Sequence, residues 1–145
     1  MTTDPSRPAL LDVNVLLALS WDQHVHHAAA HAQFGKLIGW RTSPVTEAGL
    51  VRLLLTEAVV GRKVTGQEAL GQLKALRGVP GWGWLEDDQS LAVPIVDLRV
   101  LMGRRQVTDL QLVNTAAAHG AVLATFDAGL RDSLAPADRQ WVEVW

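Results

Sequence analysis

Two short apolar runs that each end in an aspartate constrain the fold of this chain more than any other feature. Ala9-Leu10-Leu11 runs into Asp12, and residues 121–126 lead to Asp127. Short, uninterrupted apolar runs are typical of strands buried on both faces of a parallel sheet. We therefore expect both aspartates at the carboxyl ends of buried strands, where open parallel sheets bind ligands.

Helix signals separate the apolar runs along the chain. Ser43-Pro44 is typical of a helix start, and Gly39 and Gly61 are typical of helix ends. Helices are predicted over residues 14–19, 28–38, 44–60, 65–76 and 109–119, the last opened by a capping box of Thr108 and Gln111. Strands are predicted over residues 9–12, 40–42, 93–96, 121–126 and 141–145, with room for a short strand in the 78–90 loop. This alternation predicts an α/β three-layer sandwich with a mostly parallel central sheet.

The length and composition fit one globular domain. The chain has 145 residues, no cysteine and a net charge of -2, which excludes disulfides, thiolate metal sites and a polybasic tail. Residues 1–7 are expected to form a flexible leader and residues 8–145 a single domain. No apolar run reaches the roughly 18 residues of a membrane span, and no signal peptide precedes the first strand. We predict a cytoplasmic protein without membrane contact, which leaves secretion without a signal peptide open.

Two further acids stand at the starts of helices with an apolar face. Glu47 shares its helix face with Val51 and Leu54, and Asp109 shares its face with Leu112. Each acid is therefore expected to point toward the core. A carboxylate in such surroundings costs several kcal/mol unless a positive or hydrogen-bonding group compensates it.

The four acids together need a positive partner. Arg52 or the Arg104-Arg105 pair could supply charge, but these positions do not obviously reach all four carboxylates. Mg²⁺ or Mn²⁺ is the better candidate, because hard cations prefer oxygen ligands and keep waters that can become nucleophiles. The alternative gives the aspartates separate structural roles, as helix caps or turn formers.

Three segments carry these acids in a fixed order. They are LLDVNVLLAL near the start, SPVTEAGLVRLL in the middle, and VTDLQLVNTAAAHGAVLATFDAGL near the end. In order and spacing the chain resembles the PIN-domain ribonucleases, specifically the VapC-type toxins of bacterial toxin–antitoxin pairs. The resemblance spans residues 9–145 and implies the PIN-like nuclease fold.

The resemblance also implies which residues form the site. The catalytic acids and the ligands of Mg²⁺ or Mn²⁺ would be Asp12, Glu47, Asp109 and Asp127. The supporting residues would be Asn14, Arg52, Thr108 and Thr125. Val13 stands where the family often has threonine or serine, so a hydroxyl is missing at that position.

The function implied by the resemblance is metal-dependent endonucleolytic cleavage of RNA by a toxin. The toxin would be a homodimer, and a cognate VapB-type antitoxin would inhibit it by filling the active-site groove with its C-terminal segment. Two other classes stay open, an aspartyl-phosphate-type phosphohydrolase and a noncatalytic partner-binding module. The phosphohydrolase usually keeps a second acid two residues after its nucleophile, where this chain has Asn14. The binding module is disfavoured because all four acids are present.

Histidines and tryptophans give weaker signals. His27 and His31 lie one helical turn apart, but no cysteine or zinc-type glutamate motif accompanies them, so surface or dimer-face roles are favoured. Trp82-Gly83-Trp84 could stack bases or contact an antitoxin, although packing of the loop on the core is the more common role.

Overall fold

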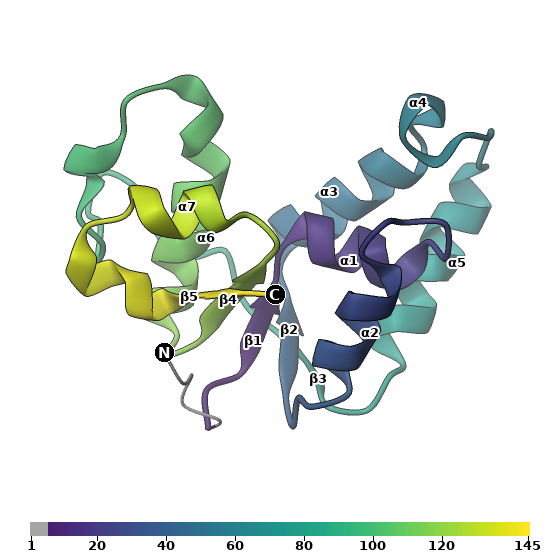
Figure 1. Cartoon of the computed structure of the whole chain (residues 1–145), viewed down its shortest axis with the longest axis horizontal. Helices are drawn as coiled ribbons and strands as arrows, with labels where there is room; N and C mark the ends of the chain where they lie inside the picture. The colour runs from purple at the N-terminus through teal and green to yellow at the C-terminus, as the bar shows by residue number, and fades with distance from the viewer. Residues whose placement is uncertain (1–5) are drawn as a thin grey trace.

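A parallel β-sheet organises the chain. The computed structural model describes residues 6–145, so residues 1–5 of the predicted leader lie outside the described residues. The sheet has the strand order β3-β2-β1-β4-β5, and each neighbouring pair is parallel (Figure 1). The strands are β1 (Ala9–Leu11), β2 (Trp40–Thr42), β3 (Trp82–Trp84), β4 (Val122–Thr125) and β5 (Val142–Val144). The prediction of an α/β fold with a mostly parallel sheet is confirmed.

Helices connect the strands. The α-helices are α1 (Val13–Ser20), α2 (His27–Phe34), α3 (Pro44–Leu54), α4 (Glu57–Val60), α5 (Gly66–Arg77), α6 (Val107–Ala118) and α7 (Ala128–Ser133). The 3-10 helices are η1 (Leu98–Val100), η2 (Arg104–Gln106) and η3 (Pro136–Trp141). α2 ends before the predicted boundary near residue 38. Within residues 6–145, no helix has the length and apolar character that a membrane span requires.

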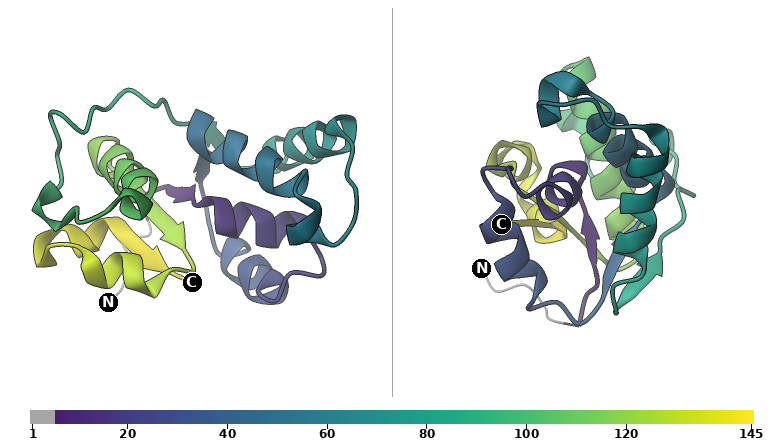
Figure 2. Two further views of the ribbon diagram at one scale, coloured as in Figure 1. Left: turned by 90° about the horizontal axis from the view of Figure 1, so that it is seen from above. Right: turned by 90° about the vertical axis from the view of Figure 1, so that its right-hand side faces the viewer.

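Alternate residues of the central strands point to opposite faces and build two cores. Leu10 and Leu123 pack with residues of α6 and α7, whereas Leu11 and Ala124 pack with residues of α1, α3 and α5. Figures 1 and 2 show the two groups of helices on either side of the sheet. The predicted three-layer arrangement is therefore confirmed, and helices on both faces leave the strand ends as the open edge of the sheet.

A glycine lets α1 and α3 approach closely next to that edge. A Cβ atom at Gly49 would lie 2.6 Å from Cγ2 of Val13. A larger side chain at position 49 would therefore push the two helices apart. This contact ties the first turn of α1, which follows Asp12, to the helix that carries Glu47.

The single helix predicted over residues 44–60 is wrong, because two helices form there. α3 ends at Leu54, and Thr56 adopts an extended backbone with φ of -91° and ψ of 101° before α4 begins. The Thr56 hydroxyl donates a hydrogen bond to the carbonyl of Arg52 at 2.7 Å. Side-chain bonds of this kind compete with helix continuation, and Gly61, with φ of +77°, then ends α4.

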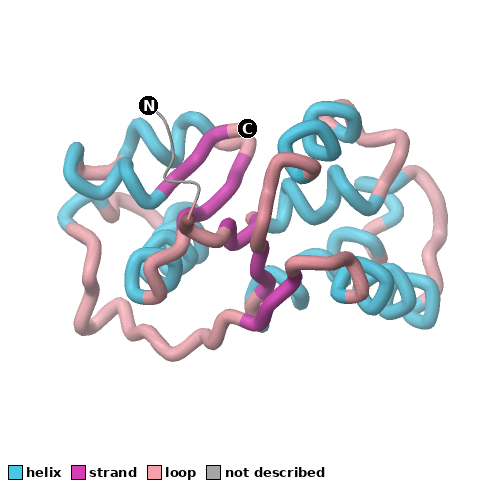
Figure 3. The backbone as a smooth tube through the Cα atoms, turned by 90° about the horizontal axis from the view of Figure 1, so that it is seen from below, coloured by secondary structure: helices cyan, strands magenta, loops and turns pink. Residues whose placement is uncertain are grey.

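The strand predicted over residues 93–96 is also wrong. Figure 3 shows the long loop that leaves β3 and crosses to the helices on the other side of the molecule. In this loop, the N–H groups of Ile95 and Val96 donate hydrogen bonds to Oδ1 of buried Asn114, at 2.8 and 3.5 Å. A side chain thus satisfies backbone groups that a neighbouring strand would otherwise bond.

α6 begins earlier than predicted. Its first residue is Val107, and its N-cap position is Gln106, which makes no side-chain capping bond. The Gln111 side chain instead donates to the loop that follows β3, so the predicted capping box of Thr108 and Gln111 does not form. Asp109 nevertheless lies in the first turn of this helix.

Candidate active site

The carboxyl ends of β1 and β4 bring three of the predicted site residues together. Leu11 pairs with Ala124 in the sheet, so Asp12 follows β1 next to Thr125, the last residue of β4. Asp127 comes two residues later and is the N-cap of α7, a helix absent from the sequence prediction. Both aspartates therefore lie at the strand ends where the sequence placed them.

The Thr125 hydroxyl connects the polar groups at this edge. It donates a hydrogen bond to Oδ2 of Asp12 at 2.7 Å, and it accepts bonds from Nδ2 of Asn14 at 3.3 Å and from the N–H of Asp127 at 3.1 Å. Oδ1 of Asp12 accepts a fourth bond, from the N–H of Val13 at 2.7 Å. Since Asp12 and Thr125 are buried, these bonds hold the Asp12 carboxylate in one orientation.

Burial raises the pKa of Asp12 above its usual value. The hydrogen bonds from Thr125 and from the N–H of Val13 oppose this effect, and the nearby charge of Asp127 adds to it. Asp127 is exposed, and its Oδ1 accepts a bond from the N–H of Leu130 at 3.1 Å. The Asp12 carboxylate therefore has hydrogen-bond donors but also a negatively charged neighbour.

Asp109 reaches the same place from the first turn of α6. Burial, together with the nearby charges of Asp12 and Asp127, raises its pKa to about 6. The charges of Asp12 and Asp127 thus act on Asp109, although the three residues come from distant parts of the chain. We call Asp12, Asp109 and Asp127 the aspartate group; its members repel one another when all are ionised.

Asn14 presents an unused oxygen next to this group. Its Nδ2 bonds to Thr125, whereas its Oδ1 is buried and has no hydrogen-bond partner within residues 6–145. A buried acceptor without a partner is destabilising, so such atoms usually bind an ordered water or an ion.

Glu47 lies apart from the aspartate group in its contacts. Oε2 of Glu47 accepts a hydrogen bond from the hydroxyl of Thr42, at the end of β2, at 2.5 Å. The same oxygen lies 3.8 Å from Nε of Arg77, at the end of α5. The side chain of Glu47 is 12% exposed, so its charge is largely shielded and is neutralised by an arginine.

Arg52, which the sequence offers as a possible source of positive charge for the acids, does not pair with Glu47. Arg52 is exposed and, among the described residues, forms no ion pair. It follows Glu47 by five positions, and residues at that spacing do not face each other on a helix. Arg77 comes from a different helix, so no local spacing in the sequence could identify it. Arg104 and Arg105 likewise form no ion pair with Asp109 in the described part of the chain.

The described residues contain no complete metal cage. Within residues 6–145, no three histidine, cysteine, aspartate or glutamate side chains are arranged to hold a metal ion. The histidines that could suggest zinc bind α1 instead: a ring nitrogen of His27 lies 2.7 Å from the carbonyl of Ala18, and one of His31 lies 3.1 Å from that of Leu19. These two side chains thus connect α2 to α1.

The chemistry of the site nevertheless fits a hard divalent cation. The aspartate group offers carboxylate oxygens only, and the unpaired Oδ1 of Asn14 adds a neutral oxygen. Mg²⁺ usually keeps several waters and needs only one or two protein carboxylates, so a cage of three side chains is not required. A bound cation would also remove the repulsion that raises the pKa of Asp109.

An open hollow of about 520 Å³ lies beside the aspartate group. Its lining includes Val13, next to Asp12, and Thr108, next to Asp109. Val45 and Leu53 of α3 add apolar surface, and Arg52 adds one positive charge. The predicted supporting residues Thr108 and Arg52 line this hollow, and among the described residues neither side chain forms a hydrogen bond or ion pair with the four acids. Thr125, in contrast, bonds to Asp12, and Asn14 bonds to Thr125.

Comparison with known families gives a match that covers most of the chain. The PIN domain family matches residues 9–133. This span contains all four predicted acids and both halves of the sheet edge described above.

Curated relatives from Mycobacterium tuberculosis (strain H37Rv) are similar over most of their length. Ribonuclease VapC39 is 44% identical over 128 residues, which cover 86% of this chain and 92% of that protein. Ribonuclease VapC38 is 44% identical over 124 residues, covering 84% of this chain and 86% of that protein. Ribonuclease VapC29 from the same strain is 37% identical over 123 residues, covering 83% and 86%.

A solved structure has the same fold. The crystal structure of PAE2754 from Pyrobaculum aerophilum superposes with a TM-score of 0.60 and covers 95% of this chain and 84% of that chain. The two sequences are 22% identical, so this likeness concerns the fold alone.

Proposed function

The chain belongs to the PIN-domain family, within its VapC group, and from this premise we propose that it is a metal-dependent endoribonuclease toxin. The proposed reaction is hydrolysis of RNA phosphodiester bonds with Mg²⁺ or Mn²⁺ as cofactor. The observation that carries the proposal is the aspartate group: the Thr125 hydroxyl bonds to Asp12 and to the N–H of Asp127 at the ends of β1 and β4, and the charges of these two aspartates help to raise the pKa of Asp109 to about 6. The curated relatives are named ribonucleases, which supports the same activity.

The proposed ligand set contains the four acids Asp12, Glu47, Asp109 and Asp127, with Oδ1 of Asn14 as a supporting oxygen. A bound Mg²⁺ or Mn²⁺ supplies positive charge for the phosphate oxygens and lowers the pKa of its bound water. Thr125 keeps Oδ2 of Asp12 oriented through its hydroxyl, and the N–H of Val13 does the same for Oδ1. The partly positive N-termini of α1 and α7 lie at Asp12 and Asp127 and favour the ionised carboxylates.

The charge distribution is compatible with an RNA substrate. Leaving the four acids out of the 15 acidic residues leaves 11, against 13 basic residues, so the rest of the chain has a balance of +2. Arg52 is exposed in the hollow beside the aspartate group, where its guanidinium is placed to contact a phosphate. RNA is therefore expected to approach along α3 and the start of α6.

The proposed partner is a VapB-type antitoxin that covers this hollow. Val13, Val45 and Leu53 form an apolar lining next to the acids, which suits the apolar side chains of a bound peptide segment. A homodimer is proposed as well. Met102, which is 85% exposed, and Val107 present apolar side chains at the start of α6 that such an interface could bury.

Cleavage assays with one variant and one control test the proposal. The purified protein is incubated with total bacterial RNA and with Mg²⁺, Mn²⁺ or EDTA, and Asp12→Asn is compared with Asp22→Asn. Asp22 is an exposed aspartate outside the site, so its variant has the same change in charge. We expect cleavage with either ion, loss of cleavage in EDTA, and loss in Asp12→Asn alone. Cleavage that persists in EDTA or in Asp12→Asn would contradict the proposal.

A further inference from the structure

Arg77, at the end of α5, lies against the rings of two tryptophans. Its guanidinium carbon is 4.1 Å from the centre of the Trp82 ring and 5.4 Å from that of Trp84. The two tryptophans belong to β3 and are two residues apart, so both side chains point to the same face of the sheet. We call Arg77, Trp82 and Trp84 the arginine clamp. Cation–π contacts of this kind restrict where the guanidinium can lie.

The arginine clamp is connected to Glu47 by two routes. Nε of Arg77 lies 3.8 Å from Oε2 of Glu47. The indole N–H of Trp82 donates to the Thr42 hydroxyl at 2.9 Å, and that hydroxyl donates to the same Glu47 oxygen. One carboxylate oxygen is thus engaged from two sides, by an ion pair and by a chain of hydrogen bonds.

These contacts separate Glu47 from the other acids. The charges that raise the pKa of Asp109 are those of Asp12 and Asp127, and Glu47 is not among them. The fourth proposed ligand therefore has its contacts on the β2–β3 side of the sheet edge.

We propose that Arg77 is a positioning residue that keeps Glu47 paired on the β2–β3 side of the sheet edge and so weakens the binding of a divalent cation at the aspartate group. This inference rests on the proposed function, because it needs the acids to bind a metal ion. It assigns a role to the Trp82-Gly83-Trp84 segment: the tryptophans fix the arginine that restrains Glu47.

Electrostatics decides the direction of the effect. Removing the positive charge of Arg77 would free a negatively charged ligand and would also remove a repulsion between the arginine and the dication. It would in turn leave the Glu47 side chain less ordered, which opposes binding through conformational entropy. A dication attracts a freed carboxylate strongly at contact distance, so the first two effects are expected to exceed the third.

The test measures metal affinity rather than cleavage. Arg77→Met removes the charge and keeps a flexible apolar side chain against the two rings. Free Mn²⁺ is counted by electron paramagnetic resonance in titrations of wild type and variant at equal ionic strength. We expect the variant to bind Mn²⁺ roughly five- to tenfold more tightly, a range that one additional carboxylate charge can produce near a protein surface. Unchanged or weaker binding in the folded variant would overturn the proposal.

A double-mutant cycle separates an effect through Glu47 from a general effect of charge. In Glu47→Gln the side chain that Arg77 restrains is no longer a carboxylate. Adding Arg77→Met to this variant should therefore lose most of the gain in affinity seen in the wild-type background. An equal gain in both backgrounds would mean that Arg77 does not act through Glu47.

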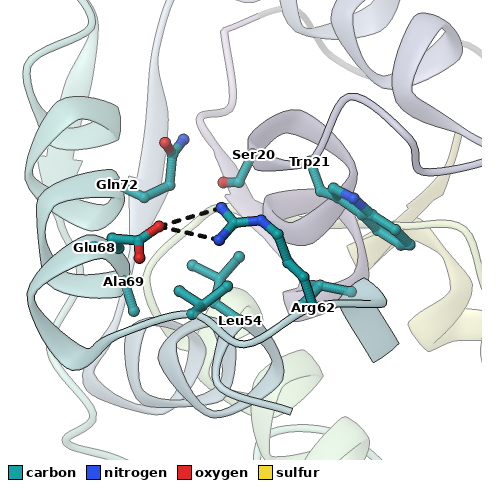
Figure 4. Close-up of a pocket in the computed structure, with 9 residues that line it drawn as sticks. Ser20, Trp21, Leu54, Arg62, Glu68, Ala69 and Gln72 are labelled. Atoms are coloured by element: carbon teal, nitrogen blue, oxygen red, sulfur yellow. Dashed lines mark hydrogen bonds and ion pairs between the residues drawn. The ribbon is translucent and has the colours of Figure 1, made fainter. Parts of the chain in front are cut away.

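Arg62 provides a matched control. It forms an ion pair with Glu68 at 3.2 Å, in a separate hollow of about 290 Å³ that Trp21 and Leu54 also line (Figure 4). Arg62→Met removes an arginine from an arginine–glutamate pair there, as Arg77→Met does at Glu47, and should leave Mn²⁺ affinity unchanged. A gain equal to that of Arg77→Met would show an effect of net charge alone and overturn the proposal.

A second variant keeps the test valid if Arg77→Met fails to fold. Trp82→Phe keeps an aromatic ring against Arg77 but removes the indole N–H that donates a hydrogen bond to the Thr42 hydroxyl. We expect a smaller gain in Mn²⁺ affinity in the same direction, and no gain would overturn the proposal. If the wild type binds no Mn²⁺ and Mn²⁺ supports no cleavage, the proposed function fails; if it binds Mn²⁺ but the variants show no gain, the inference alone fails.

Discussion

Carboxylates have different partners on the two sides of the sheet edge. At the ends of β1 and β4, the three carboxylates of the aspartate group lie near one another, and none forms an ion pair with a lysine or arginine among residues 6–145. At the ends of β2 and β3, the single carboxylate of Glu47 is paired with Arg77 and bonded to Thr42. One side of the edge accumulates negative charge, and the other neutralises it.

This difference separates a functional arrangement from a structural one. Clustered acids destabilise a fold through repulsion and desolvation, so their presence favours a role that needs the negative charge. Paired acids have an adequate structural explanation by themselves. The β1–β4 side is therefore the stronger indication of cation binding, and Glu47 contributes to it only if its pairing with Arg77 is released.

Asp12→Asn should have the largest effect on this contrast. It removes a proposed metal ligand, so cleavage should fall by more than the roughly 100-fold that loss of an outer-shell partner can cost. In the metal-free protein it should also lower the pKa of Asp109 from about 6, because one of the charges that raise this pKa disappears. RNA cleavage and carboxyl carbon shifts in NMR titrations measure the two effects. An unchanged Asp109 titration would show that the aspartates are not coupled.

Thr125→Val should have the next largest effect. The variant leaves Asp12 without its hydroxyl donor and removes the acceptor of Asn14 and of the N–H of Asp127. Loss of such an outer-shell partner typically costs 10–100-fold in metal affinity or activity, so a decrease of about that size is expected. Thr125→Ser keeps the hydroxyl and should restore most of the affinity in Mn²⁺ titrations. A serine variant as weak as the valine variant would assign the effect to packing.

The aspartate group also predicts how stability depends on pH and on metal. Because the pKa of Asp109 is raised from 3.8 to about 6, ionising this group costs more in the folded than in the unfolded chain. Its contribution to the free energy of unfolding is therefore fully present below about pH 4 and is lost as the pH rises through about 6. Asp109 is half-buried, so solvent screening limits the difference to about 1 kcal/mol.

Urea unfolding in EDTA measures this difference when wild type is compared with Asp109→Asn. The variant should gain stability relative to wild type between about pH 4 and pH 7, and Mg²⁺ at about 100 times its dissociation constant should stabilise wild type by about 2.7 kcal/mol. If Mg²⁺ stabilised both proteins equally, Asp109 would not be part of the cation site.

The β1–β4 side could be predicted from the sequence, and the β2–β3 side could not. Asp12 and Asp127 follow short apolar runs, and this local pattern places each at the end of a buried strand; the sheet then makes the two strands neighbours. The pairing of Glu47 depends on Arg77 and on Trp82, which meet only through the packing of α5 and β3. Sequence spacing carries no signal for such a contact.

The errors in the fold have the same origin. The helix break at Thr56 and the irregular segment at Ile95 and Val96 both depend on side chains that bond to the backbone. The Asn114 bond joins residues that are 19 positions apart, so only the tertiary fold reveals it. Patterns of apolar residues predict which segments are buried, whereas the partners of individual polar groups require the three-dimensional arrangement.

Arg52→Ala should have the smallest effect, and it tests whether Arg77 alone, and not Arg52, restrains Glu47. Arg52 is exposed in the hollow beside the aspartate group and forms no ion pair with Glu47 among the described residues. Its removal should therefore leave Mn²⁺ affinity unchanged, in contrast to Arg77→Met. If Arg52 contacts an RNA phosphate, KM should rise by a few-fold while kcat stays the same, because a positioning contact to the backbone affects binding. If Arg52→Ala changed Mn²⁺ affinity as much as Arg77→Met does, the two arginines would act alike on the acids. The difference between the two sides of the sheet edge would then not depend on the pairing of Glu47 with Arg77.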